Sequence, residues 1–120
     1  MSKLYNDTLS IVSTSAVQYA GSGPPSARLV LEGAVPPVVY PLTRDAYTLG
    51  RGAKNDIVVN DQNVSTFHAR LERGVSGFKV YDLRSTNGTA INMKRVLDPV
   101  PLKGNDVLNL GPVRLLYLED

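Results

Sequence analysis

The sequence predicts an all-β domain, either a sandwich or a barrel. From Arg28 onward, short apolar runs are separated at close spacing by Gly, Pro, Asn and Asp, which end strands and form turns. Several runs alternate apolar and polar residues with a period of two, which is typical of a strand with one buried face. No stretch of useful length shows the helical period, so we expect very little helix.

Nine segments have the composition of strands. They are residues 28–33, 38–42, 46–50, 56–60, 67–73, 78–83, 89–92, 106–110 and 113–119. In the segment "FHARLER", apolar and polar residues alternate from Phe67, so we expect Phe67 to face the core and His68 to face outward. The sequence "GVSG" at 74–77 predicts a hairpin loop after this strand.

The first 27 residues differ in composition from the rest of the chain. They are rich in Ser, Thr, Ala and Gly and run into "GSGPPS", which cannot continue a regular element. We therefore predict a flexible flank or linker at 1–27, with one short strand around Leu9–Val12, and a domain at 28–120. A 120-residue chain can bury a real hydrophobic core.

The composition excludes several classes of function. Thirteen basic and eleven acidic residues leave a charge of only +2, with no dense run of Lys or Arg, so a nucleic-acid partner is not expected. The chain has no cysteine, which excludes disulfides and thiolate metal sites. It shows neither a signal peptide nor the ~20 apolar residues that a membrane span needs, so we expect a cytoplasmic protein with no membrane partner.

The segment "VSTFHARL" at 64–71 contains the chain's single histidine, three residues after Ser65. A catalytic Ser–His pair needs a third group and an oxyanion hole, and Ser65 lacks the G-x-S-x-G elbow. A strand would also separate Ser65 from His68 by ~10 Å and point them to opposite faces, so the two touch only if they lie in a turn. We therefore expect no enzyme activity, no metal site and no cofactor.

Three polar loops separate the central predicted strands. They are "GRGAKND" at 50–56, "NDQNVST" at 60–66 and "RSTNG" at 84–88. The first loop is neither G-x-G-x-x-G nor a Walker loop, and no predicted helix follows it, so nucleotide binding is not expected.

The same loops carry side chains that suit a phosphate monoester. Arg51 offers a guanidinium, Ser65 and Thr86 offer hydroxyls, and Asn87 offers an amide. A phosphate monoester carries about −1.5 to −2 charge and three strong acceptor oxygens, which such donors satisfy through charge-assisted hydrogen bonds.

Each residue also has a simpler explanation. Arg51 could be a solvated loop arginine, Ser65 a turn residue, and Asn87–Gly88 a plain hairpin turn. In a strict meander, successive loops fall at opposite ends of the sheet. Spacing alone therefore leaves open whether the three loops meet.

Five blocks of sequence, in order from Arg28 to Leu118, resemble the forkhead-associated (FHA) domain. The blocks are "YTLGR", "NDIVVND", "VSTFHARL", "VYDLRSTNGTAIN" and "LKGNDVLNLG". The resemblance implies an antiparallel β-sandwich of about eleven strands with its ligand loops at one end. It also implies a module that binds phosphothreonine-containing peptides without catalysis. The implied partner is a Ser/Thr kinase or a substrate of that kinase, and the implied process is signalling by that kinase.

The resemblance further implies a role for each loop residue. Arg51 is expected to be the main phosphate contact, Ser65 and Thr86 to donate hydroxyls, and Thr66 to assist. Asn87 is expected to hold the ligand main chain. Many family members carry a basic residue at the position of Thr66, so its replacement here makes the site depend more heavily on Arg51.

Supporting residues follow from the same resemblance. Gly50, His68 and Gly88 are expected to be structural, with His68 bracing the loops of Arg51 and Ser65. Asn63 and the variable segment 93–104 are expected to set the preference for neighbouring ligand side chains.

Two alternatives remain open at the level of sequence. The domain could bind a partner through a sheet face or edge, independently of phosphate. Alternatively, Thr8 or Thr14 in the flank could be phosphorylated and dock onto this domain or onto a second copy.

Overall fold

The computed structural model describes residues 27–120. The predicted strand at Leu9–Val12, Thr8, Thr14 and the flank before Ala27 lie outside the described residues. Within them the strands are β2 (Ala27–Leu31), β3 (Val38–Pro41), β4 (Ala46–Gly50), β5 (Ile57–Val58), β6 (Ala69–Gly74), β7 (Gly77–Asp82), β8 (Thr89–Ile91), β9 (Lys94–Arg95), β10 (Val100–Pro101), β11 (Val107–Leu110) and β12 (Val113–Glu119).

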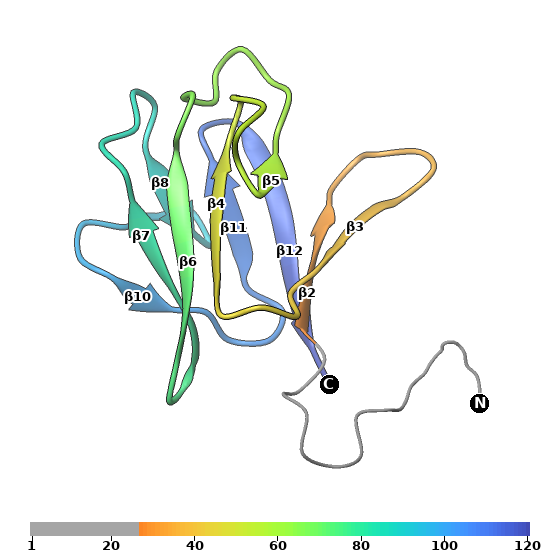
Figure 1. The fold of residues 1–120 in the computed structure, drawn as a ribbon, viewed down its shortest axis with the longest axis vertical. Coiled ribbons are helices and arrows are strands. Elements are labelled where there is room, and N and C mark those ends of the chain that lie inside the picture. The colour runs from red at the N-terminus through yellow and green to blue at the C-terminus, as the bar shows by residue number, and fades with distance from the viewer. Residues whose placement is uncertain (1–26) are drawn as a thin grey trace.

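These strands form two sheets that pack face to face (Figure 1). One sheet has the order β10-β7-β6-β4-β5 and the other the order β3-β2-β12-β11-β8-β9. The prediction of an all-β sandwich is therefore confirmed. All nine predicted strands are present, and β6 and β7 form the predicted hairpin, in which Gly74 pairs with Gly77.

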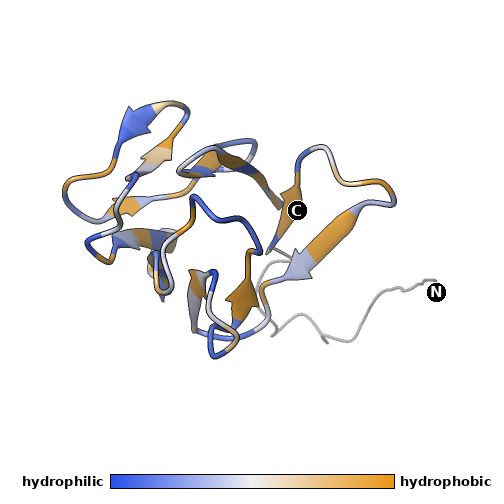
Figure 2. Ribbon diagram, turned by 90° about the horizontal axis from the view of Figure 1, so that it is seen from above, coloured by the Kyte–Doolittle hydropathy of each residue, from blue (hydrophilic) through white to orange (hydrophobic). Residues whose placement is uncertain are grey.

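The core lies between the two sheets and follows the predicted alternation. Tyr47 and Leu49 on β4, and Leu115 and Tyr117 on β12, are buried, while the residues between them are more exposed. Burying one such apolar side chain stabilises the fold by about 1.5–3 kcal/mol. Figure 2 shows most of the hydrophobic colour on the strands and most of the hydrophilic colour on the loops.

One strand pair departs from the antiparallel prediction. Eight of the nine pairs are antiparallel, but β4 and β5 run parallel, with Leu49 opposite Ile57 and Gly50 opposite Val58. Because the two strands run in the same direction, the loops that follow β4 and β5 emerge at the same end of the sandwich.

The predicted orientation of Phe67 and His68 is wrong. Phe67 is 46% exposed, whereas the side chain of His68 is fully buried. Strand β6 begins only at Ala69, and residues 65–68 form a turn in which the Ser65 N–H donates to His68 Nδ1 over 3.1 Å. The alternation holds from Ala69 onward, but it does not extend back into the turn.

Two short strands escaped prediction. The strands β9 and β10 have two residues each, which is too short for any alternating pattern. A two-residue turn joins β8 to β9, and both its residues have positive φ, 51° at Asn92 and 69° at Met93. Such a turn matches the twist of a hairpin.

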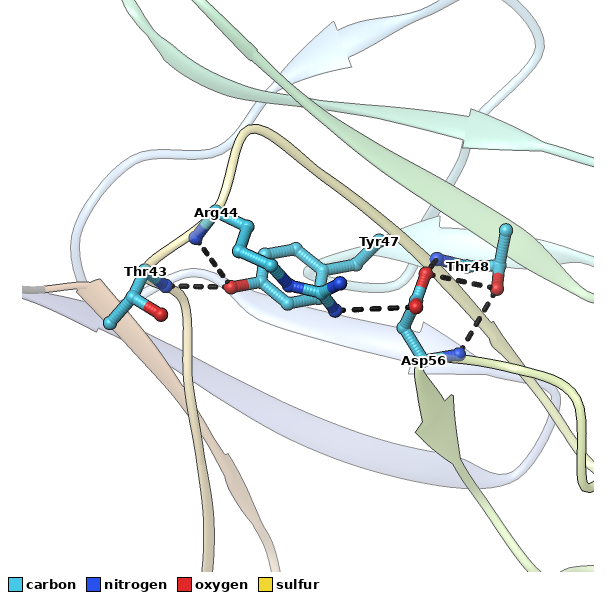
Figure 3. Close-up of polar contacts among 5 residues, drawn as sticks. All are labelled: Thr43, Arg44, Tyr47, Thr48 and Asp56. Atoms are coloured by element: carbon cyan, nitrogen blue, oxygen red, sulfur yellow. Dashed lines mark hydrogen bonds and ion pairs between the residues drawn. The ribbon is translucent and has the colours of Figure 1, made fainter.

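A polar cluster fixes the first loop to β4 (Figure 3). The carboxylate of Asp56 accepts a hydrogen bond from the Thr48 N–H over 2.8 Å and pairs with the Arg44 guanidinium over 3.2 Å. These contacts hold the pKa of Asp56 below its usual range, the Thr48 hydrogen bond being the larger cause. The Tyr47 hydroxyl accepts hydrogen bonds from the backbone N–H groups of Thr43 and Arg44, over 2.6 and 2.7 Å.

We predict that Tyr47→Phe lowers the free energy of unfolding by about 1–2 kcal/mol, because two backbone N–H groups lose their acceptor. For a domain of this size, the melting temperature should fall by roughly 4–8 °C per kcal/mol. Thermal melts followed by circular dichroism measure this. Tyr40→Phe is the matched control, because the half-buried Tyr40 makes no hydroxyl hydrogen bond within residues 27–120 and should melt like the parent. Equal melting of both variants would contradict the assigned role of Tyr47.

Candidate functional site

Three polar loops meet at one end of the sandwich. They are residues 51–56, 59–68 and 83–88, and in Figure 1 they lie together at the top. Hydrogen bonds join them: the Arg51 N–H donates to the Ser65 carbonyl over 2.9 Å, and the Thr86 N–H donates to Ser65 Oγ over 3.0 Å. The structure therefore answers the question that spacing left open.

Gly50 permits the first two loops to touch. A Cβ atom at this position would lie 2.3 Å from the Thr66 carbonyl oxygen, so no larger residue fits without moving the backbone. The buried Asn55 joins the same two loops, because its Nδ2 donates hydrogen bonds to the carbonyls of Gly52 and Thr66 over 2.8 and 2.6 Å. The structural role predicted for Gly50 thus has a steric cause.

The Arg51 side chain is exposed but oriented. Its Nε donates to the Val64 carbonyl over 3.0 Å, and one terminal nitrogen lies 3.5 Å from Thr66 Oγ1. No ion pair within residues 27–120 involves Arg51. The remaining N–H groups of the guanidinium therefore face solvent with their charge uncompensated by a neighbouring carboxylate.

A hydrogen bond from backbone to side chain joins Thr86 to Ser65. Ser65 Oγ accepts the Thr86 backbone N–H, which leaves the Ser65 hydroxyl proton available as a donor. Ser65 is half-buried, and Thr66 and Thr86 are exposed. The Thr66 hydroxyl thus lies beside the oriented guanidinium, and Ser65 is held to the Arg51 backbone through its carbonyl.

His68 joins the second and third loops. Its Nδ1 accepts the Ser65 N–H, and because a backbone N–H can only donate, the ring proton must sit on Nε2. Nε2 then donates to the Gly88 carbonyl over 2.8 Å. The prediction had His68 bracing the loops of Arg51 and Ser65, whereas the two ring hydrogen bonds join the Ser65 loop to Gly88.

Asn87 and Asn63 contact each other across the same end. Asn87 Nδ2 donates to the Asn63 carbonyl over 2.8 Å, and within residues 27–120 its side-chain oxygen and second amide N–H make no hydrogen bond. Gly88 follows with φ of +87°, a conformation that favours glycine. Since β7 and β8 belong to different sheets, Asn87–Gly88 is not the hairpin turn that its sequence alone would suggest.

Asp82 holds the third loop, and sequence reasoning assigned it no role. Its carboxylate accepts hydrogen bonds from the hydroxyls of Ser85 and Thr89 and from the Ser85 N–H. Burial raises the pKa of Asp82, but these hydrogen bonds outweigh burial, so its pKa lies below the ordinary value. Asp82 and the buried Asn55 both lie in blocks that carry the family resemblance. That resemblance was the sequence signal that could have identified both residues as part of the site.

The arrangement suits binding more than bond-breaking. Ser65 reaches His68 through its backbone N–H and reaches Thr86 through its hydroxyl, so the pair lacks the hydroxyl-to-imidazole contact that a nucleophile requires. Across residues 27–120 no group of three or more acidic or histidine side chains is placed to hold a metal ion. The same part of the chain contains no helix long and apolar enough to cross a membrane.

We predict that Asp82→Asn destabilises the domain by about 1–2 kcal/mol near neutral pH, because hydrogen bonds to a charged acceptor are lost. The folded pKa of Asp82 lies below its ordinary 3.8, so its contribution is present above about pH 4 and is lost as pH falls through the folded value. Melts of parent and variant should therefore converge on acidification, with the exposed Asp98→Asn as control. A gap that stays constant down to about pH 2 would contradict this.

The comparisons with known proteins agree with the geometry. The family model described as "FHA domain" matches residues 47–111, more than half of the chain. The oxoglutarate dehydrogenase inhibitor of Corynebacterium diphtheriae is 36% identical over 78 residues, which cover 65% of this chain and 54% of the inhibitor. The chain thus spans about half the length of that curated relative.

Two solved structures share the fold at 28% identity. Mycobacterium tuberculosis EmbR, in complex with a low-affinity phosphopeptide, superposes with a TM-score of 0.75 over 82% of this chain and 26% of EmbR. A structure from a study of phosphothreonine-dependent FHA domain interactions superposes with a TM-score of 0.71 over 78% of this chain and 95% of its own. The chain belongs to the FHA domain family.

Proposed function

We propose that this domain binds phosphothreonine-containing segments of a partner protein and has no catalytic activity. The observation that carries the proposal is that Arg51 and Ser65 lie together at one end of the sandwich, joined through their backbones, and that the oriented Arg51 guanidinium makes no ion pair within residues 27–120. A phosphate dianion needs charge and several short donors at one place, and both are present there. The phosphopeptide complex of EmbR supports the same kind of ligand.

Each residue has a proposed task. Arg51 binds the phosphate oxygens, Ser65 and Thr86 donate hydroxyls to them, and Thr66 assists from the rim. Asn87 binds the ligand main chain with its free side-chain oxygen and N–H, and Asn63 orients that amide through its carbonyl. Because Arg51 is the single cation in this set, it supplies most of the charge-assisted affinity.

The partner follows from the ligand chemistry. A phosphothreonine is made by a Ser/Thr kinase, so we propose that the partner is such a kinase or one of its substrates. We place the interaction in the cytoplasm, where ATP supports phosphorylation.

We predict that Arg51→Ala weakens phosphopeptide binding by at least about tenfold, because each charge-assisted hydrogen bond contributes about 1.5–3 kcal/mol and 1.4 kcal/mol is tenfold. The probe is the tightest sequence from a degenerate phosphothreonine library, and calorimetry gives the affinity. Since Arg51 is an exposed loop residue, the melting temperature should move by no more than about 4 °C.

Arg28→Ala is the matched control. Arg28 lies on β2 away from the site, and its one ion pair within residues 27–120 is with Asp120 over 3.4 Å, so the variant should bind like the parent. The unphosphorylated peptide should lose nearly all affinity for the parent. Equal binding of both peptides would favour a phosphate-independent interaction through a sheet face or edge, and undiminished binding by Arg51→Ala would remove the assigned phosphate contact.

A further inference from the structure

A second candidate binding surface lies between the edges of the two sheets. Strand β9 is the last strand of one sheet and β10 the last of the other, and the chain crosses between them at residues 96–99. A groove of about 430 Å³ opens at this crossing. Its lining residues are Ile91, Asn92, Lys94, Arg95, Val96, Val100, Pro101, Lys103 and Asp106.

The groove is basic. Three cationic side chains, Lys94, Arg95 and Lys103, line it together with one carboxylate, Asp106. That carboxylate already accepts hydrogen bonds from Asn92 Nδ2 and from the Lys103 backbone N–H, over 2.9 and 2.8 Å. None of the three cations makes an ion pair within residues 27–120, so the groove keeps a net positive charge.

The groove begins where the phosphothreonine site ends. Nε and Cζ of Arg95 lie 2.9 and 3.1 Å from the position that a Cβ atom would take at Gly88. The guanidinium of Arg95 therefore packs against the backbone of Gly88, directly after Asn87, the proposed contact for the ligand main chain. A ligand that passes Asn87 on this side meets Arg95 next.

The floor and rim of the groove also suit an extended peptide. Among the lining residues Val96 is buried, while Val100 and Pro101 are partly exposed; Leu97 and Met93, next to the lining residues in the chain, are 84% and 77% exposed. Both β9 and β10 are edge strands, and an edge strand presents backbone groups that the sheet does not pair. Apolar surface, free backbone and positive charge together fit a peptide with acidic side chains.

We propose that this groove binds an acidic segment of the same ligand, close in sequence to its phosphothreonine, since Arg95 packs against Gly88 directly after Asn87. This inference rests on the proposed function and deepens it. The carboxylates of the segment pair with Arg95, Lys94 and Lys103, and its backbone lies along the two strand edges. A ligand with acidic residues on that side is preferred over one with neutral residues.

The test uses three phosphothreonine peptides with one shared core, the full chain, and calorimetry. One peptide has neutral flanks, one has three glutamates before the phosphothreonine, and one has three after it. We expect one acidic peptide, but not both, to bind at least about tenfold more tightly than the neutral peptide. In Arg95→Gln/Lys103→Gln, the ratio of acidic to neutral affinity should fall toward one.

A second double variant controls for overall charge. Arg70→Gln/Arg28→Gln removes the same two charges from β6 and β2, strands that contribute no residue to the groove. This variant should keep the ratio of the parent. Raising the salt from about 0.05 M to about 0.5 M should lower the ratio in the parent, since screening shortens the range of surface charges.

The outcomes separate the two proposals. Binding of the neutral peptide with no gain from glutamates on either side would overturn the groove and leave the phosphothreonine site intact. An equal loss in both double variants, or displacement of the acidic peptide by a single-stranded DNA oligonucleotide, would also overturn it. Failure of all three peptides to bind would overturn both.

Discussion

The two hydrogen bonds of the buried His68 ring fix the geometry on which the site depends. Nδ1 accepts the Ser65 N–H and Nε2 donates to the Gly88 carbonyl, so the second and third loops are held together. Because the ring is fully buried, either backbone group would lose its partner without gaining water if the ring moved. The position of the Ser65 hydroxyl, and through it of Thr86, follows from this bridge.

Topology explains why these loops can be bridged at all. In a strict meander, the loops after β4, β5 and β7 would not share one end. Here β4 and β5 run parallel, and the chain after β7 changes sheets to enter β8, so all three loops arrive at the top of Figure 1. The first loop is then joined to the second by the close approach of Gly50 to Thr66 and by the hydrogen bond that Asn55 donates to the Thr66 carbonyl. Specificity in such a design belongs to the loops, and stability to the sandwich.

The sequence predicted the strands well because alternation with a period of two reports directly on which face is buried. It failed at Phe67 and His68 because alternation does not reveal where a strand begins, and these two residues belong to the preceding turn. It missed β9 and β10 because two residues hold no period. The site residues came from the family resemblance, while their convergence depended on a parallel pair and a change of sheet. Local sequence does not encode such long-range pairings in a readable form.

The net charge of the chain is a second sequence property that does not reveal the site. A net charge of +2 gives no indication of an anionic ligand, yet the pairing of charges in the fold is uneven. The arginines that pair with carboxylates are Arg28, Arg44, Arg70, Arg73 and Arg114. Within the described part of the chain, Arg51 and Arg95 have no such partner, and both lie against the loops of the site. Pairing elsewhere cancels charge in the sum, but it leaves an uncompensated positive field at the end of the sandwich where a phosphate would bind, and that field attracts anionic ligands before contact is made.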